Sequence, residues 1–122
     1  MKTRQFRDLV VWRRAMGLAR DIYSVTENFP RKEAYGLTSQ LCRAAVSVPS
    51  NIAEGHGRLS DKSFVLFLTQ ARGSLYELET QLELSQSFGY AEEETCKRLL
   101  ADCAEIGRML NGLISNLRET TH

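Results

Sequence analysis

Apolar residues recur at intervals of three and four along most of the chain, in four segments that glycine and proline separate. This spacing is the period of an α-helix that buries one face. The pattern predicts helices over about residues 8–26, 33–56, 60–87 and from about 91 onward. No segment alternates apolar and polar residues for long enough to predict a strand.

The four predicted core stripes differ in length but share this period. In the first two helices they are Leu9, Trp12, Met16, Ala19 and Tyr23, then Leu37, Leu41, Ala44 or Ala45, Val48 and Ile52. In the last two they are Phe64, Phe67, Leu68, Ala71, Leu75, Leu78 and Leu82, then Cys96, Leu99, Leu100, Cys103, Ile106, Leu110, Leu113 and Leu117.

A second set of apolar residues falls beside or behind these stripes: Val10, Val11, Leu18, Val65 and Leu66. We expect these residues to be exposed in a four-helix monomer. Scattered apolar residues are normal on protein surfaces. A contiguous set would instead favour self-association, and we favour an oligomer.

Short connections between the predicted helices favour an antiparallel, up-down-up-down four-helix bundle, with residues 1–122 forming one domain. Pro30 ends the first helix region, and Gly89 stops the third. Pro49 lies inside the second helical pattern, where it removes a backbone donor, so we expect a kink or short break. Gly55 and Gly57 are expected to end that helix.

Composition is that of an ordinary globular protein, with 43% hydrophobic and 25% charged residues over 122 positions. The net charge of +1 excludes a uniformly basic nucleic-acid-binding coat. Its distribution is uneven, since residues 1–62 hold eleven Lys and Arg against six Asp and Glu, and residues 63–122 hold five against nine. The first half therefore carries +5 and the second −4.

Three cysteines, an odd number, argue against a disulfide framework. The chain has neither an N-terminal signal-peptide pattern nor a membrane-length apolar run, so we expect a reduced, cytoplasmic protein. Paired histidine or Cys-x-x-Cys spacing is missing, and we expect no metal and no cofactor.

One face of the second helix is polar, and the third helix offers a comparable face with Gln70, Ser74, Glu77 and Gln81. We predict a structural polar network there, formed by Gln40, Arg43, Ser47, Asn51, Glu54 and Glu77. The alternatives are two solvated surfaces or a functional surface. An enzyme would have to use Glu54, Glu77 and His56, but no nucleophile motif or Glu-x-x-His pair accompanies them, so we expect no catalysis.

A line of arginines on the first helix could follow a phosphate backbone. The candidate nucleic-acid contacts are Arg7, Arg13, Arg14, Arg20 and Arg43. The alternative is a solvated face that complements the acidic half of the chain, within one subunit or between subunits.

Several sequence runs resemble a bacterial four-helix-bundle family associated with intervening sequences in large-subunit ribosomal RNA genes. They are Phe6-Arg7-Asp8-Leu9-Val10-Val11-Trp12, Phe29-Pro30 with Glu33, Tyr35-Gly36-Leu37-Thr38-Ser39-Gln40-Leu41, Arg43-Ala44-Ala45, Val46-Ser47-Val48-Pro49, Ser50-Asn51-Ile52-Ala53-Glu54-Gly55, Ala71-Arg72-Gly73-Ser74 and Glu77-Leu78-Glu79. The resemblance covers nearly the whole chain and implies a four-helix bundle that forms a homopentameric ring. A more distant similarity is to the accessory variability protein of diversity-generating retroelements, which implies binding of nucleic acid and a reverse transcriptase.

Two functions remain open from these observations. The first is a homo-oligomeric, non-enzymatic module that binds structured RNA or a ribonucleoprotein through its basic N-terminal surface. The second is an assembly scaffold for protein alone, with no nucleic-acid binding.

Overall fold

The computed structural model describes residues 5–119, and all regular structure in this range is helical. The four long helices are α1 (Val10–Thr26), α2 (Leu37–His56), α3 (Asp61–Ser87) and α4 (Glu93–Glu119). Two 3-10 turns, η1 (Phe6–Asp8) and η2 (Arg31–Glu33), precede α1 and α2. The predicted all-helical, four-helix fold is confirmed. None of these helices is both long and apolar enough to cross a bilayer.

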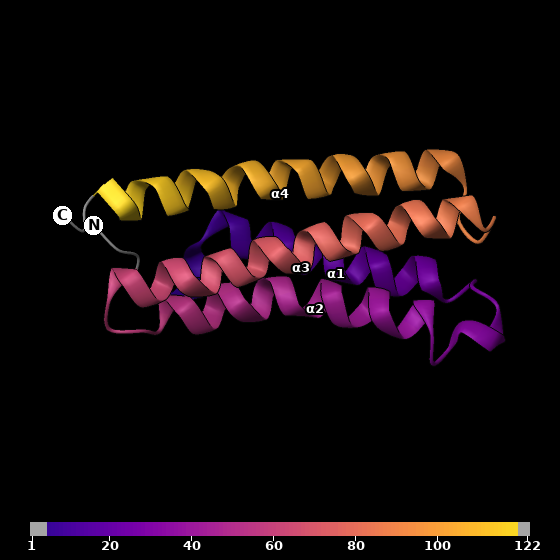
Figure 1. The fold of residues 1–122 in the computed structure, drawn as a ribbon, viewed down its shortest axis with the longest axis horizontal. Helices are drawn as coiled ribbons and strands as arrows, with labels where there is room; N and C mark the ends of the chain where they lie inside the picture. Colours follow the sequence, from indigo (N-terminus) through magenta and orange to yellow (C-terminus); the bar gives the residue numbers. More distant parts are fainter. Residues whose placement is uncertain (1–4, 120–122) are drawn as a thin grey trace.

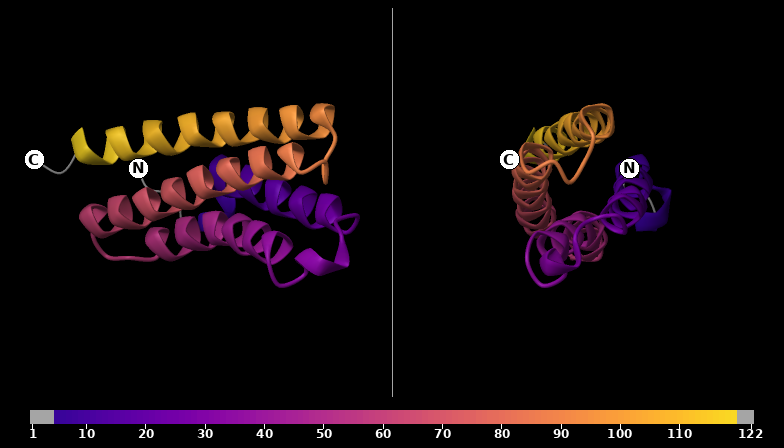
Figure 2. Two further views of the ribbon diagram at one scale, coloured as in Figure 1. Left: turned by 45° about the vertical axis from the view of Figure 1, so that its right-hand side comes forward. Right: turned by 90° about the vertical axis from the view of Figure 1, so that its right-hand side faces the viewer.

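The helices lie roughly along one axis, and successive helices are joined at alternating ends of the molecule (Figure 1). Seen along that axis, they occupy the four corners of a bundle (Figure 2, right). The pair α1 and α2 lies on one side and the pair α3 and α4 on the other. Helix α2 packs most extensively against α3, whereas α1 and α4 make the smallest helix-to-helix contact.

Helices α2, α3 and α4 bury the stripes that their sequences predict, with Leu41, Leu68, Leu75, Leu99 and Leu110 fully enclosed. The predicted stripe of α1 is confirmed at Ala19, while Leu9 and Trp12 are only partly buried against the core. The core face of this helix is Val11, Ala15, Leu18, Ala19 and Ile22; Val11 and Leu18, expected to be exposed, are only 5% and 3% exposed. Tyr23, predicted to be in the core, is 52% exposed. Val10 and Leu66, from the apolar set predicted to lie beside the stripes, are exposed as expected.

The helix ends follow local chemistry. The Ser60 hydroxyl accepts the Ser63 N–H at 3.1 Å and caps α3. Gly89 has φ of 77° just after α3, a conformation that side chains other than glycine rarely adopt. Helix α2 continues through Pro49 without a break and ends at His56, as predicted, with Gly57 as the residue that caps it. The break predicted at Pro49 is wrong, while the kink stays a prediction.

Gly55 allows the closest contact between α2 and α3. A Cβ atom built at Gly55 would lie 2.6 Å from Phe67 Cβ and 3.0 Å from Phe64 Cδ1. Any side chain would therefore separate two helices whose seam is the main contact of the fold. Position 55 therefore requires glycine because of this contact between the helices, and not because the helix ends nearby.

Glu33 joins the two connections at one end of the bundle. Its carboxylate accepts the N–H of Leu37 at the start of α2 at 3.1 Å, and the hydroxyl of Tyr90 from the α3–α4 connection at 3.0 Å. The Leu37 amide, followed by the Tyr90 hydroxyl, lowers the pKa of Glu33. The same bond to Glu33 raises the pKa of Tyr90.

Replacing Gly55 with alanine is expected to destabilise the protein by about 1–3 kcal/mol, because overpacking outweighs the roughly 1 kcal/mol gained in helix propensity. The free energy of unfolding in urea measures this. Gly112→Ala is the matched control, since no atom lies within 4 Å of the added Cβ. It should be neutral or stabilising, and equal behaviour of the two variants would contradict the packing argument.

Replacing Glu33 with glutamine is expected to lower the melting temperature at neutral pH. Because the pKa of Glu33 is lowered in the folded state, its contribution is present above the ordinary value of 4.5 and is lost as the pH falls through the folded pKa. The difference in melting temperature between wild type and variant should thus shrink on acidification. A double-mutant cycle with Tyr90→Phe isolates the bond between the two side chains. A difference in melting temperature between wild type and Glu33→Gln that does not change with pH would contradict the role given to the Glu33 carboxylate.

Candidate functional site

An apolar groove of about 570 Å³ runs along the outer side of α1 and α2. Helix α1 lines it with Trp12, Met16 and Tyr23, and α2 lines it with Val46 and Pro49. None of these α1 side chains is fully buried, and Val46 is 42% exposed. The residues predicted as the core stripe of the first helix therefore form an outer surface. Large apolar side chains gathered on a surface are typical of an interaction site.

The five candidate phosphate contacts do not form one surface. The Arg13 guanidinium donates to the backbone carbonyls of Arg7 at 2.9 Å and Asp8 at 3.3 Å, so it holds η1 against α1. Arg14 forms an ion pair with Glu105 of α4. Arg20 lines the apolar groove instead.

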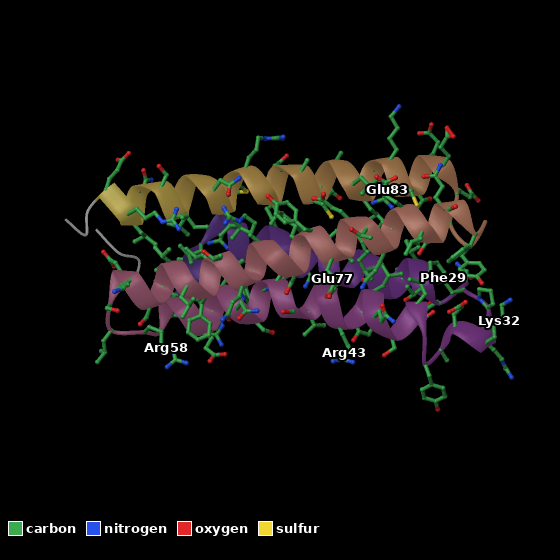
Figure 3. The ribbon with its side chains drawn as sticks, in the orientation of Figure 1. Phe29, Lys32, Arg43, Arg58, Glu77 and Glu83 are labelled. Atoms are coloured by element: carbon green, nitrogen blue, oxygen red, sulfur yellow. The ribbon has the colours of Figure 1, made fainter. Side chains whose placement is uncertain are left out.

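Arg43 lies apart from the α1 arginines, in a polar groove of about 390 Å³ between α2 and α3. Figure 3 labels Arg43 and Glu77 on neighbouring parts of these two helices. Both line the polar groove, yet no ion pair joins them among the described residues. The predicted network therefore does not include a bond between these two side chains.

Hydrogen bonds do join another part of the predicted network. The Ser47 hydroxyl lies 2.8 Å from the Ser74 hydroxyl, and the Asn51 amide donates to the Ser47 carbonyl at 2.9 Å and hydroxyl at 3.0 Å. Ser74, on the polar face predicted for the third helix, thus links α3 to α2. Gln40 lines the polar groove, whereas Glu54 pairs with Arg58 at 2.8 Å, one turn along the same helix.

The three residues that an enzyme would use have separate environments. Glu54 is engaged by Arg58, and the ring of the buried His56 packs edge-on against Phe64, with 5.7 Å between centroids. Glu77 belongs to the polar groove with Arg43, and neither Glu54 nor His56 lines that groove. The arrangement therefore does not bring the three side chains together.

The cysteine thiols are free and, in α4, inaccessible. Cys96 and Cys103 are fully buried, as the sequence predicts, and Cys42 is partly buried. Burial, with the nearby carboxylates of Glu79 and Asp102, raises the pKa of Cys103 to about 12. A thiol of this kind is protonated at neutral pH and unsuited to nucleophilic chemistry.

Sequence reasoning misses two features of these surfaces. The first is the apolar groove, whose α1 residues Trp12, Met16 and Tyr23 form a second stripe displaced by one residue from the core stripe. Because both stripes have helical spacing, the pattern does not show which one is buried. Gln81 belongs to the polar face predicted for the third helix but is only 6% exposed. Nothing in the sequence pattern distinguishes Gln81 from its exposed polar neighbours.

The described residues thus form a small four-helix bundle with an apolar and a polar groove on its outer surface. A solved structure shares this fold: a protein of unknown function from the S23 ribosomal protein family of Bacteroides thetaiotaomicron is similar, with a TM-score of 0.78 and 26% sequence identity over 86% of this chain and 98% of that one. Among curated proteins, none matches this chain. The family model of the 23S rRNA-intervening sequence proteins matches residues 7–112, and the chain belongs to this family.

Proposed function

We propose that this protein is a homo-oligomeric, non-enzymatic interaction module whose copies associate through the α1–α2 groove. The observation that carries the proposal is the groove itself, defined by Trp12, Met16, Tyr23, Val46 and Pro49. Contact with another copy would remove this apolar surface from water, which is favourable in proportion to the area buried. The resemblance in the sequence implies that the assembly is a homopentamer.

The opposite side of the bundle offers a surface that fits the groove. Helix α3 exposes Leu66 by 57% and Leu84 by 42%, on the helix face turned away from the core. The α1–α2 and α3–α4 sides lie opposite each other (Figure 2, right). Contacts between two different, opposite surfaces are head-to-tail, and such contacts generate rings when the rotation closes.

Charge supports the same arrangement. The half of the chain that includes α1 and α2 carries +5, and the half with α3 and α4 carries −4. A head-to-tail contact brings the basic side of one copy to the acidic side of the next. A contact between two identical α1–α2 surfaces would instead oppose like charges, which is unfavourable.

Structured RNA is the partner that we propose for the assembled module. Arg7 and Arg13 are exposed at η1 and at the start of α1, and neither lines the α1–α2 groove. The other three candidates are left out of this surface: Arg14 pairs with Glu105, Arg20 lines the α1–α2 groove, and Arg43 lies in the polar groove. In an assembly each arginine is repeated, so that individually weak phosphate contacts add up.

The same surfaces give no role to Glu54, Glu77 and His56 as a catalytic set, and we propose that the protein has no enzymatic activity. The free cysteines are those of a protein in a reducing compartment, which supports a cytoplasmic location.

Replacing Val46 with glutamate is expected to break the assembly, because it places a charge in the apolar contact. Native mass spectrometry of the wild type should give about five times the 13.8 kDa monomer mass, and the variant should give the monomer. The matched control is Val10→Glu, a valine that is 53% exposed but lies outside the groove. Circular dichroism should show that both variants keep their helices.

Two results would count against this contact. A wild type that is monomeric at micromolar concentration contradicts self-association itself. An intact assembly in both variants contradicts the assignment to the α1–α2 groove.

Replacing Arg7 and Arg13 together with glutamine is expected to weaken binding to a labelled structured RNA. For every phosphate that the variant no longer binds, the slope of log affinity against log salt should fall by about 0.7–0.9. Fluorescence anisotropy between about 50 and 200 mM salt measures both quantities. Arg43→Gln is the matched control and should leave both unchanged.

Equal affinity and slope for the wild type and the double variant would contradict the proposed RNA surface. An intact assembly without RNA binding at low salt would favour the alternative, a scaffold that contacts protein alone.

A further inference from the structure

The polar groove between α2 and α3 contains a cation and an anion that nothing in the described chain neutralises. Arg43 lies on the α2 side and Glu77 on the α3 side, and both side chains are exposed. Neither forms a hydrogen bond or ion pair within residues 5–119. Opposite charges that share a groove without pairing leave both free to contact a third group (Figure 3).

The side chain of Gln81 independently indicates that a hydrogen-bond donor is missing from this groove. Its side chain lines the same groove and is 6% exposed, and its Oε1 atom is buried with no hydrogen-bond partner among the described residues. A buried acceptor without a donor is unfavourable, and native proteins contain few of them.

Other polar atoms of the groove satisfy one another. Ser47 and Ser74 share a hydrogen bond across the two helices, and Asn51 donates to Ser47. This bonded pair joins α2 and α3 about one helical turn from Arg43 and Glu77. The groove is therefore held in shape while three of its groups remain available.

We propose that this groove binds a small zwitterionic molecule that carries a carboxylate and an ammonium group, of the α-amino acid class. The carboxylate pairs with the Arg43 guanidinium, whose planar fork suits two carboxylate oxygens. The ammonium has three N–H donors, which serve the Glu77 carboxylate and, after the Gln81 side chain turns toward the groove, Gln81 Oε1. The volume of about 390 Å³ falls within the range of small-molecule sites.

Other classes of ligand fit less well. The side chains that line the groove are Gln40, Arg43, Ala44, Ser47, Ser74, Glu77 and Gln81. This set contains no aromatic ring on which a nucleobase would stack. A phosphate would meet the Glu77 carboxylate beside its only cation, and a divalent metal would find only one carboxylate ligand.

The test is a titration of ¹⁵N-labelled protein with glycine and with L-serine, followed by the NMR signals of the Gln81 side-chain amide and Arg43 Nε–H. Both amino acids should give saturable shifts. Acetate and methylamine each carry one half of the proposed chemistry and should bind at least about tenfold more weakly. No saturable shift with either amino acid, or equal binding of acetate, would overturn the proposal.

Three variants assign the binding to the named groups. Arg43→Gln and Glu77→Gln should each weaken binding about tenfold or more, because each loses a charged hydrogen bond. Glu83→Gln is the matched control: this exposed carboxylate lies on α3 outside the groove, and the variant should bind as the wild type does. Equal affinity in all three variants would overturn the assignment.

Gln81→Leu separates a ligand role from a structural one. The variant removes an unpaired buried acceptor, so we expect it to melt at the same or a higher temperature than the wild type while binding is abolished. Its native mass should be unchanged. Loss of the assembly in this variant would show that a neighbouring copy pairs with Gln81, and would overturn the proposal without contradicting the α1–α2 contact.

Discussion

The close packing of α2 against α3 is the constraint on which the other surfaces depend. Gly55 lets Phe64 and Phe67 approach the backbone of α2, and Ser47 and Ser74 meet farther along the same seam. With this seam fixed, one side of α2 faces α3 and another faces α1. The two grooves form on either side of α2, so that their lining residues are held at a set distance and orientation.

Helix α1 is apolar over a wider arc than its core face alone occupies. Its core face, from Val11 to Ile22, packs into the bundle, while Trp12, Met16 and Tyr23 face outward beside α2. A helix with a single apolar face would complete a monomer and leave nothing to associate. The apolar surface that α1 carries beyond its core face lies on the helix whose contact with α4 is small.

The sequence predicts most of this fold and less of the surfaces, for a physical reason. Strong helical periodicity and the stops at Pro30 and Gly89 locate all four helices, and the cores of α2 and α4 follow directly. On α1, two apolar stripes have the same spacing, and spacing alone does not reveal which one packs inward. A proline at position 49 predicts a kink or a short break, and no break is present, because α2 packs against both α1 and α3 despite the missing donor. Arg43 and Glu77 lie in one groove without pairing, since helix spacing determines a face but not whether two side chains meet.

The polar and the apolar groove also differ in the free-energy cost of leaving each of them unoccupied. Exposed apolar side chains lose little in a single monomer and would gain from burial against another copy. Gln81 is different, because its oxygen is buried in the folded chain with no hydrogen-bond partner among the described residues, which is unfavourable. A leucine at this position would remove that cost without a change of fold. The presence of glutamine therefore argues for a group that reaches it from outside the chain, and the charges of Arg43 and Glu77 on either side define what that group must carry.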